Sequence, residues 1–200
     1  MLTRHTVLHD KQSERSSKDR TDSTPRSLTL VLSSRTRTEC VGRFIGQVVL
    51  GGDVLALVGT LGAGKTTLVR GIAEGLNIPS HHVSSPTFVL AHEYRGRIPF
   101  THIDLYRVKD VSEAEASGLA DCFTQENVTA VEWADRFPDW LPSDRLEIRL
   151  GHRSPVSRQL TLTALGPAAS VLLARVTPLL KKSSSRRPIS RSGRKRVSRR

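Results

Sequence analysis

The chain has 200 residues, of which 37% are hydrophobic and 25% are charged, and its formal net charge is +12. This length is sufficient for one domain with a hydrophobic core. Residues 181–200 contain ten basic and no acidic side chains, whereas residues 26–180 contain 16 basic and 15 acidic ones. Because the excess charge lies in the tail, the net charge does not indicate a basic nucleic-acid-binding face on the folded body.

The apolar runs and the cysteines of the chain indicate its location and redox state. No apolar run approaches the roughly 20 residues that span a bilayer, and residues 1–20 lack the apolar stretch of a secretory signal. We therefore expect a cytoplasmic protein without a membrane segment. Cys40 and Cys122 have no neighbouring Cys or paired His at metal spacing, so we expect reduced thiols rather than a disulfide or a zinc site.

The N-terminal part of the chain changes character near residue 26. Residues 1–25 are polar and carry charges of both signs, and we expect a disordered leader. Alternating leucines over residues 28–32 then predict a short strand at a sheet edge. A helix is expected next, with Thr36 or Thr38 as its N-cap. Its apolar positions recur at spacings of three and four, at Val41, Phe44, Ile45, Val48 and Val49.

Residues 54–68 read VLALVGTLGAGKTTL and contain a phosphate-binding loop with the spacing G-x-x-x-x-G-K-T. Its glycines allow backbone N–H groups to turn towards phosphate oxygens, Lys65 adds a cation, and the Thr66 hydroxyl can bind Mg²⁺. A chance glycine-rich turn is disfavoured, because the motif lies between a predicted buried strand and a predicted helix over residues 66–76. The expected nucleotide-binding residues here are Gly59, Thr60, Leu61, Gly62, Ala63, Gly64, Lys65, Thr66 and Thr67.

Three downstream segments supply further candidates. The Ser-Ser-Pro-Thr stretch in residues 83–90 is able to place a hydroxyl or a backbone amide near a γ-phosphate, although a plain strand-entry turn is the interpretation that this short pattern alone favours. Predicted strands over residues 98–104 and 127–132 end in Asp104 and Glu132, which are rivals for a magnesium role. The local pattern does not decide between them. His102 is interpreted as a structural histidine without a chemical role.

The remaining pattern predicts an extension of the fold. A capped helix begins near Ser112, and strictly alternating residues 145–150 and 157–164 predict an antiparallel pair of strands. Residues 167–180 predict a last short helix that is broken at Pro178. Residues 181–200 repeat Ser, Arg and Lys, and we expect a disordered basic tail.

Taken together, the phosphate loop, SPTF at residues 85–88, HIDLYR at 102–107 and VEW at 131–133 resemble the TsaE (YjeE) family. The resemblance extends over about residues 28–163, and GLADCF at 118–123 is similar to a stretch that commonly follows in this family. Where the family often has proline and glutamate after the tryptophan, this chain has Ala134 and Asp135.

The resemblance implies an ATPase of bacterial tRNA modification. Family members act with TsaD, TsaB and a TsaC-type enzyme to install threonylcarbamoyladenosine at position 37 of ANN-decoding tRNAs, and ATP hydrolysis resets the TsaD and TsaB complex between turnovers. Carried over residue by residue, the resemblance implies that Lys65 and its loop hold phosphates and that Thr66 binds Mg²⁺. Further implied roles are a switch-like segment for Thr87, a Walker-B-type place for Asp104, a second acidic place for Glu132, and contact with nucleotide or partner for Trp133.

These observations predict a three-layer α/β P-loop NTPase-type domain over residues 26–180. Its sheet is expected to be mainly parallel with an antiparallel extension, and one ATP and Mg²⁺ site lies outside the carboxyl ends of the central strands. Arg107 is the nearest candidate for an arginine finger, with a structural ion pair as the favoured alternative. Slow hydrolysis without a partner is therefore expected.

Two other classes of function remain open from the sequence. A small-molecule kinase uses the same loop, but it requires an acceptor pocket and usually an arginine-rich lid. A nucleic-acid-binding module would act through the basic tail, whose ten cations attract phosphate backbones such as that of tRNA weakly and non-specifically. The oligomeric state and the partner interface are not indicated by any pattern.

Overall fold

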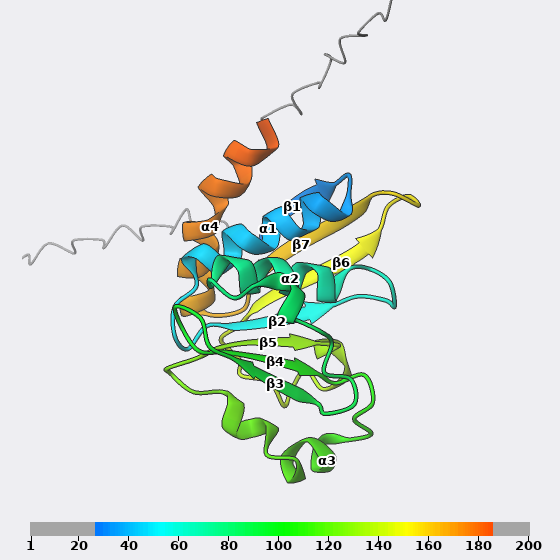
Figure 1. The fold of residues 1–200 in the computed structure, drawn as a ribbon, viewed down its shortest axis with the longest axis vertical. Helices are drawn as coiled ribbons and strands as arrows, with labels where there is room; N and C mark the ends of the chain where they lie inside the picture. Colours follow the sequence, from blue (N-terminus) through cyan, green and yellow to red (C-terminus); the bar gives the residue numbers. More distant parts are fainter. Residues whose placement is uncertain (1–26, 186–200) are drawn as a thin grey trace, which may run out of the picture.

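A computed structural model describes residues 27–185 of the chain (Figure 1). The expected leader and residues 186–200 of the expected basic tail lie outside the described residues. The described part forms a seven-stranded sheet in the order β1-β7-β6-β2-β5-β4-β3. Its strands are β1 (Ser27–Leu32), β2 (Val54–Val58), β3 (Ala91–Tyr94), β4 (Phe100–Asp104), β5 (Val128–Glu132), β6 (Leu146–His152) and β7 (Arg158–Ala164).

The centre of the sheet is parallel and both of its sides are antiparallel. Strand β2 pairs in parallel with β5 and β6, and β5 pairs in parallel with β4. All residues of β2, β4 and β5 are buried, as expected for parallel strands that are covered on both faces. The antiparallel pairs are β1 with β7, β6 with β7, and β3 with β4. The predicted α/β class, the edge position of β1 and the β6–β7 pair are confirmed, whereas β3 was not predicted.

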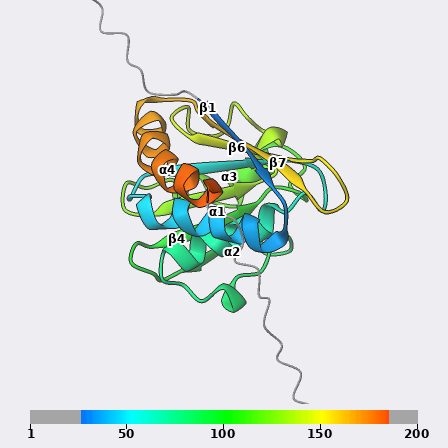
Figure 2. The same ribbon diagram turned by 90° about the horizontal axis from the view of Figure 1, so that it is seen from above.

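Helices lie on both faces of this sheet. Two hydrophobic cores result: α1, α2 and α4 pack on one face, and α3 packs on the other with the 3₁₀ helices at Leu119–Cys122 and Ala134–Arg136. Figures 1 and 2 show α1, α2 and α4 grouped together, and Figure 1 shows α3 apart from them. The helices are α1 (Arg35–Val48), α2 (Lys65–Gly75), α3 (Val111–Ala116) and α4 (Pro167–Ser185), with 3₁₀ helices at Ser80–His82, Leu119–Cys122 and Ala134–Arg136.

The observed N-caps of α1 and α3 lie earlier in the chain than the sequence indicated. Helix α1 is capped by Ser34, whose Oγ accepts a hydrogen bond of 3.1 Å from the backbone N–H of Arg37. Thr38 instead lies inside the helix and is buried. Helix α3 is capped by Asp110 rather than beginning at Ser112. In both cases the cap is the residue with an extended backbone directly before the helix, and not the hydroxyl residue further along the chain.

The predicted break at Pro178 and the predicted end near residue 180 are wrong, because α4 continues through Pro178 to Ser185. A proline inside a helix leaves the carbonyl four residues earlier without its usual donor, and that residue, Ala174, is exposed and accessible to water. Buried side chains on both sides of the proline, including Val176 and Leu180, pack into the core and favour one continuous helix. None of the helices in residues 27–185 is sufficiently long and apolar to cross a membrane.

Helices α1 and α2 approach each other so closely that glycine is required at their contact. Gly42 and Gly46 of α1 face Gly71 and Gly75 of α2. A Cβ atom at Gly46 would overlap the carbonyl oxygen of Ile72, and a Cβ at any of the other three would overlap a backbone carbonyl of the opposite helix. Two glycines four residues apart on each helix therefore permit backbone contact between α1 and the helix that follows the phosphate loop.

We predict that Gly46→Ala lowers the free energy of unfolding by about 1–3 kcal/mol, because the helix backbones must move apart to accommodate the methyl group. Denaturant unfolding followed by circular dichroism measures this. The matched control is Gly151→Ala, since a Cβ at Gly151 in β6 has no atom within 4 Å. Equal stability of the two variants would contradict the close packing of α1 on α2.

Candidate functional site

The phosphate loop connects β2 to α2, as the sequence predicts. Gly59 and Gly64 have φ values of 152° and 107°, which L side chains rarely adopt. Gly64 is also the residue that precedes the first turn of α2, so the free backbone N–H groups of this helix face the loop. This end of a helix favours anions, because unpaired N–H groups and the helix dipole act together. The loop therefore has the backbone geometry of a phosphate site.

Lys65 lies inside this loop and is 5% exposed. Its Nζ donates hydrogen bonds of 2.7 Å to the Gly59 carbonyl and 3.2 Å to the Thr60 carbonyl. The same Nζ lies 3.5 Å from the centre of the Trp133 ring. Burial lowers the pKa of the Lys65 ammonium below its ordinary value, and the nearby Glu132 carboxylate partly opposes this shift. An anionic ligand that reached Lys65 would compete with the face of the indole for the ammonium.

The two candidate acids lie side by side at the carboxyl end of the sheet. Asp104 and Glu132 are register partners at the ends of β4 and β5, and they are 2% and 3% exposed. The Thr66 hydroxyl donates a hydrogen bond of 3.1 Å to Glu132 Oε2. The structure thus brings together the three residues that the sequence indicated for magnesium.

Asp104 differs from Glu132 in its hydrogen-bond partners, which lie outside the phosphate loop. Oδ2 lies 2.5 Å from Ser85 Oγ and 2.7 Å from Thr87 Oγ1, and Oδ1 accepts a hydrogen bond of 2.9 Å from the backbone N–H of Tyr106. Ser85 and Thr87 are thereby held against the end of β4. The segment is more than a strand-entry turn, because its hydroxyls reach the acid at the candidate site.

His102 also belongs to this cluster. It is fully buried, and its Nε2 lies 3.0 Å from Glu132 Oε1. Its Nδ1 has no hydrogen-bond partner in residues 27–185. The sequence interpretation assigned His102 no chemical role. The alternation of strand residues places His102 on the same face of β4 as Asp104, and this was the signal that could have linked it to the site.

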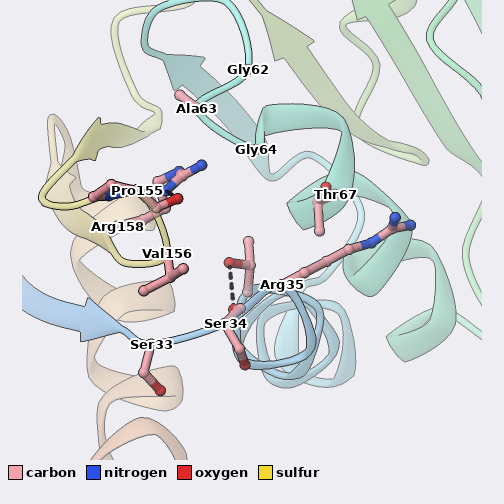
Figure 3. A pocket seen from close by; sticks show the side chains of 11 residues that line it. Ser33, Ser34, Arg35, Gly62, Ala63, Gly64, Thr67, Pro155, Val156 and Arg158 are labelled. Atoms are coloured by element: carbon pink, nitrogen blue, oxygen red, sulfur yellow. Dashed lines mark hydrogen bonds between the residues drawn. The ribbon is translucent and has the colours of Figure 1, made fainter.

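Two cavities lie on either side of the phosphate loop, and Gly62 and Gly64 line both. The smaller has a volume of about 390 Å³ and contains the acids. The larger has a volume of about 560 Å³ (Figure 3). The smaller is lined by Leu61, Gly62, Gly64, Lys65, Thr66, Thr67, Ser85, Thr87, Asp104, Tyr106, Glu132 and Trp133. The larger is lined by Ser33, Ser34, Arg35, Thr38, Gly62, Ala63, Gly64, Thr67, Pro155, Val156 and Arg158.

Aromatic side chains surround the smaller cavity. Trp133 has a positive φ of 61°, a conformation that costs a non-glycine residue about 1–3 kcal/mol, and its ring lies 4.9 Å from that of Tyr106. Arg136 donates hydrogen bonds to the carbonyls of Tyr106 and Val108, which tie the segment after β5 to the segment after β4. The strained backbone at Trp133 is therefore supported by contacts from the neighbouring loop.

Arg107 does not form the ion pair that was favoured from the sequence. Its guanidinium lies 4.3 Å from the centre of the Phe88 ring, and no salt bridge in residues 27–185 includes it. Leu61 lines the cavity that contains the acids and is 76% exposed, and Phe88, which follows the lining residue Thr87 in sequence, is 81% exposed.

The available donors fit a hard cation. No group of three or more His, Cys, Asp or Glu residues within the described residues is arranged to hold a metal. Cys40 and Cys122 are free and half-buried. The set that remains is two carboxylates and a hydroxyl beside a phosphate loop, and Mg²⁺ is commonly bound through few carboxylates together with phosphate oxygens. These residues fit Mg²⁺ and do not fit zinc.

The strand, glycine-rich loop and helix, with a lysine, a threonine and two acids around them, define a P-loop protein with an α/β fold. Comparison with known families supports and narrows this class. The family model described as threonylcarbamoyl adenosine biosynthesis protein TsaE matches residues 32–160. The chain belongs to the TsaE family, as its resemblance in sequence indicated.

Individual relatives agree with this assignment. The chain is 42% identical over 130 residues to the Bacillus subtilis (strain 168) tRNA threonylcarbamoyladenosine biosynthesis protein TsaE, which covers 64% of this chain and 80% of that protein. It is 36% identical over 150 residues to the Nostoc sp. protein of the same name, covering 72% of this chain and 91% of that one. Among solved structures, Bacillus subtilis YdiB matches with a TM-score of 0.64 and 31% identity, covering 80% of this chain and 97% of that chain.

We predict that nucleotide binding changes the fluorescence of Trp133. Because phosphate oxygens compete with the indole for Lys65, adding ADP and Mg²⁺ to a Trp140→Phe variant should alter the emission of Trp133 in a saturable way. Trp140 lies beside Phe123 and not in the cavity, so this substitution leaves Trp133 as the sole tryptophan of the chain.

The control for this experiment is Lys65→Met in the same Trp140→Phe background, in which no saturable change is expected. Emission that stays constant in Trp140→Phe while calorimetry records bound ADP would contradict the competition between phosphate and Trp133.

Proposed function

We propose that this protein is a Mg²⁺-dependent ATPase required for threonylcarbamoyladenosine modification at position 37 of ANN-decoding tRNAs. In this proposal it binds the TsaD and TsaB homologues and uses ATP hydrolysis to permit repeated turnover of that complex. The observation that carries the proposal is the hydrogen bond from Thr66 in the phosphate loop to Glu132, with Asp104 beside it, in a chain of the TsaE family. Contact with tRNA is indirect or weak, and the site of action is the cytoplasm.

The phosphates of ATP would lie in the smaller cavity. Backbone N–H groups of residues 62–66 and the Lys65 ammonium would bind the phosphate oxygens. The larger cavity is on the other side of Gly62 and Gly64, and its volume of about 560 Å³ lies in the range of small-ligand sites. We propose that it holds the nucleoside, between the start of α1 and the β6–β7 connection (Figure 3).

The hydrogen bonds favour a division of labour between the two acids. Glu132 Oε2 is bonded to Thr66, whose hydroxyl is the expected magnesium ligand, so Glu132 and Thr66 would hold Mg²⁺ directly. Asp104 instead accepts its hydrogen bonds from Ser85, Thr87 and Tyr106, which lie outside the phosphate loop. Asp104 would therefore act on the metal through water while it holds the Ser85 and Thr87 hydroxyls in place. Bound Mg²⁺ supplies neutralisation of phosphate charge.

Hydrolysis requires an oriented water and compensation of charge on the transferred phosphoryl group. Lys65 and the loop amides would compensate charge, and the Thr87 hydroxyl and the two acids, which line the smaller cavity, would orient water. No arginine is among the described residues that line the smaller cavity, and Arg107 is stacked on Phe88. We propose that hydrolysis is slow until a partner completes the site, and that the partner covers the exposed Leu61 and Phe88.

The test is a reconstituted modification reaction with TsaD and TsaB homologues, a TsaC-type enzyme and an ANN-decoding tRNA. We predict many modified tRNAs per TsaD with the wild-type chain, and at most one with Lys65→Ala, because that variant loses its phosphate-binding cation. ATP turnover should rise at least about tenfold when the partners are added, as expected when a partner supplies a charge-stabilising group.

Three results would contradict the proposal. Equal modification with wild type and Lys65→Ala would remove the phosphate loop from the function. ATP turnover that is as fast for the isolated protein as for the complex would remove the partner dependence. A phosphorylated small molecule in place of free phosphate would identify a kinase instead.

A further inference from the structure

His102 is a buried residue of β4 that contacts Glu132 of the candidate site. Its imidazole lies on β4 and reaches across to Glu132 at the end of β5, and both side chains are almost wholly buried. The strand register explains this contact. His102 is the partner of Ala130, two residues before Glu132, so the two side chains are diagonal neighbours on one face of the sheet.

The two oxygens of Glu132 have separate partners. Oε1 lies 3.0 Å from His102 Nε2, and Oε2 accepts a hydrogen bond of 3.1 Å from the Thr66 hydroxyl. Because an ionised carboxylate only accepts hydrogen bonds, Nε2 carries the hydrogen of this contact. One oxygen is thus occupied within the sheet, and the other is directed at the phosphate loop. Rotation of the carboxylate would break the contact with His102.

The other ring nitrogen of His102 argues against a merely structural role. Nδ1 is buried and has no hydrogen-bond partner within residues 27–185. An unpaired polar atom in a core is destabilising, and an apolar side chain of similar size would avoid that cost. What the histidine supplies here that an apolar residue lacks is the N–H that fixes Glu132.

We infer that His102 is a positioning residue that orients the Glu132 carboxylate so that Oε2 faces Mg²⁺ beside Thr66. This inference rests on the proposed function, since it assigns His102 a task in the metal site proposed there. Partners that hold a metal-binding carboxylate in place typically contribute about 10- to 100-fold to metal affinity or activity. His102 touches neither nucleotide nor metal itself.

The experiment compares two amides at position 102. In His102→Gln the side-chain amide extends to about the place of Nε2 and can still donate to Glu132, whereas in His102→Asn it extends only to about the place of Nδ1. For each variant, calorimetry measures the affinity for a non-hydrolysable ATP analogue with Mg²⁺ and with EDTA. The Mg²⁺ dependence of ATP turnover is measured in parallel.

We predict that His102→Asn and His102→Leu raise the half-saturating Mg²⁺ concentration by about 10- to 100-fold. Affinity for the analogue in EDTA should remain within about threefold of wild type, since the phosphate loop is unchanged. His102→Gln should retain most of the Mg²⁺ dependence. The control for lost stability is Thr101→Val, which lies in the same strand as His102 but does not line the smaller cavity, and which removes the hydrogen bond that Thr101 Oγ1 accepts from Asn127. It should leave the Mg²⁺ dependence unchanged.

The outcomes separate this inference from the proposed function. If wild type binds the analogue with a strong Mg²⁺ dependence and His102→Asn matches it, the inference is wrong and the proposed function stands. If Gln and Asn lose Mg²⁺ dependence equally, positioning through Nε2 is wrong. If wild type itself has no Mg²⁺ dependence, the metal site of the proposed function fails, and the inference fails with it. The comparison of Gln with Asn decides the matter even where His102→Leu does not fold.

Discussion

Parallel pairing of β4 with β5 places Asp104 and Glu132 at the same level of the sheet, next to the strand that leads into the phosphate loop. Parallel strands end at the same edge, so polar residues that follow each hydrophobic run gather there without being close in sequence. Here the two acids have different hydrogen-bond partners. Glu132 is bonded to Thr66 of the loop, and Asp104 is bonded to Ser85 and Thr87. Glu132 thus connects the sheet to the phosphate loop, and Asp104 connects it to the segment that contains Ser85 and Thr87.

A second constraint acts from the helical side. The glycines of α1 and α2 bring the two helices into backbone contact. The start of α1 and the phosphate loop line the same cavity, so the position of one relative to the other depends on this packing. A small change at the helix contact would therefore alter the cavity that we propose for the nucleoside, although the glycines themselves do not line it. The stability of the fold and the shape of the larger cavity therefore both depend on the contact between α1 and α2.

The parts of the structure that the sequence predicts well are those with a local cause. The phosphate loop depends on glycines and a lysine within eight residues, and the strand, loop and helix follow in order. The edge strand β1 and the β6–β7 pair show the alternation from which they were predicted. The resemblance to the TsaE family then assigned the SPTF, HIDLYR and VEW segments to one site without knowledge of the strand pairing.

What could not be predicted depends on contacts between distant segments. The short strand β3 has only four residues, and its pairing with β4 defines it more than its own composition does. The continuity of α4 through Pro178 comes from burial on both sides of the proline. His102 looked like an isolated structural histidine, because its partner is 30 residues away and is adjacent only through the register of β4 and β5. Ranking Asp104 against Glu132 likewise required their hydrogen-bond partners.

The most direct measurement is a crystal structure of the protein with Mg²⁺ and a non-hydrolysable ATP analogue. The arrangement of hydrogen bonds predicts that Thr66 Oγ1 and a Glu132 oxygen both contact the metal, at the distance of about 2.0–2.1 Å that Mg²⁺ requires. Asp104 should keep its bonds to Ser85 and Thr87 and reach the metal through water. A structure in which Asp104 binds Mg²⁺ directly and Glu132 lies away from it, with the Ser85 and Thr87 hydroxyls released, would contradict this account of the site.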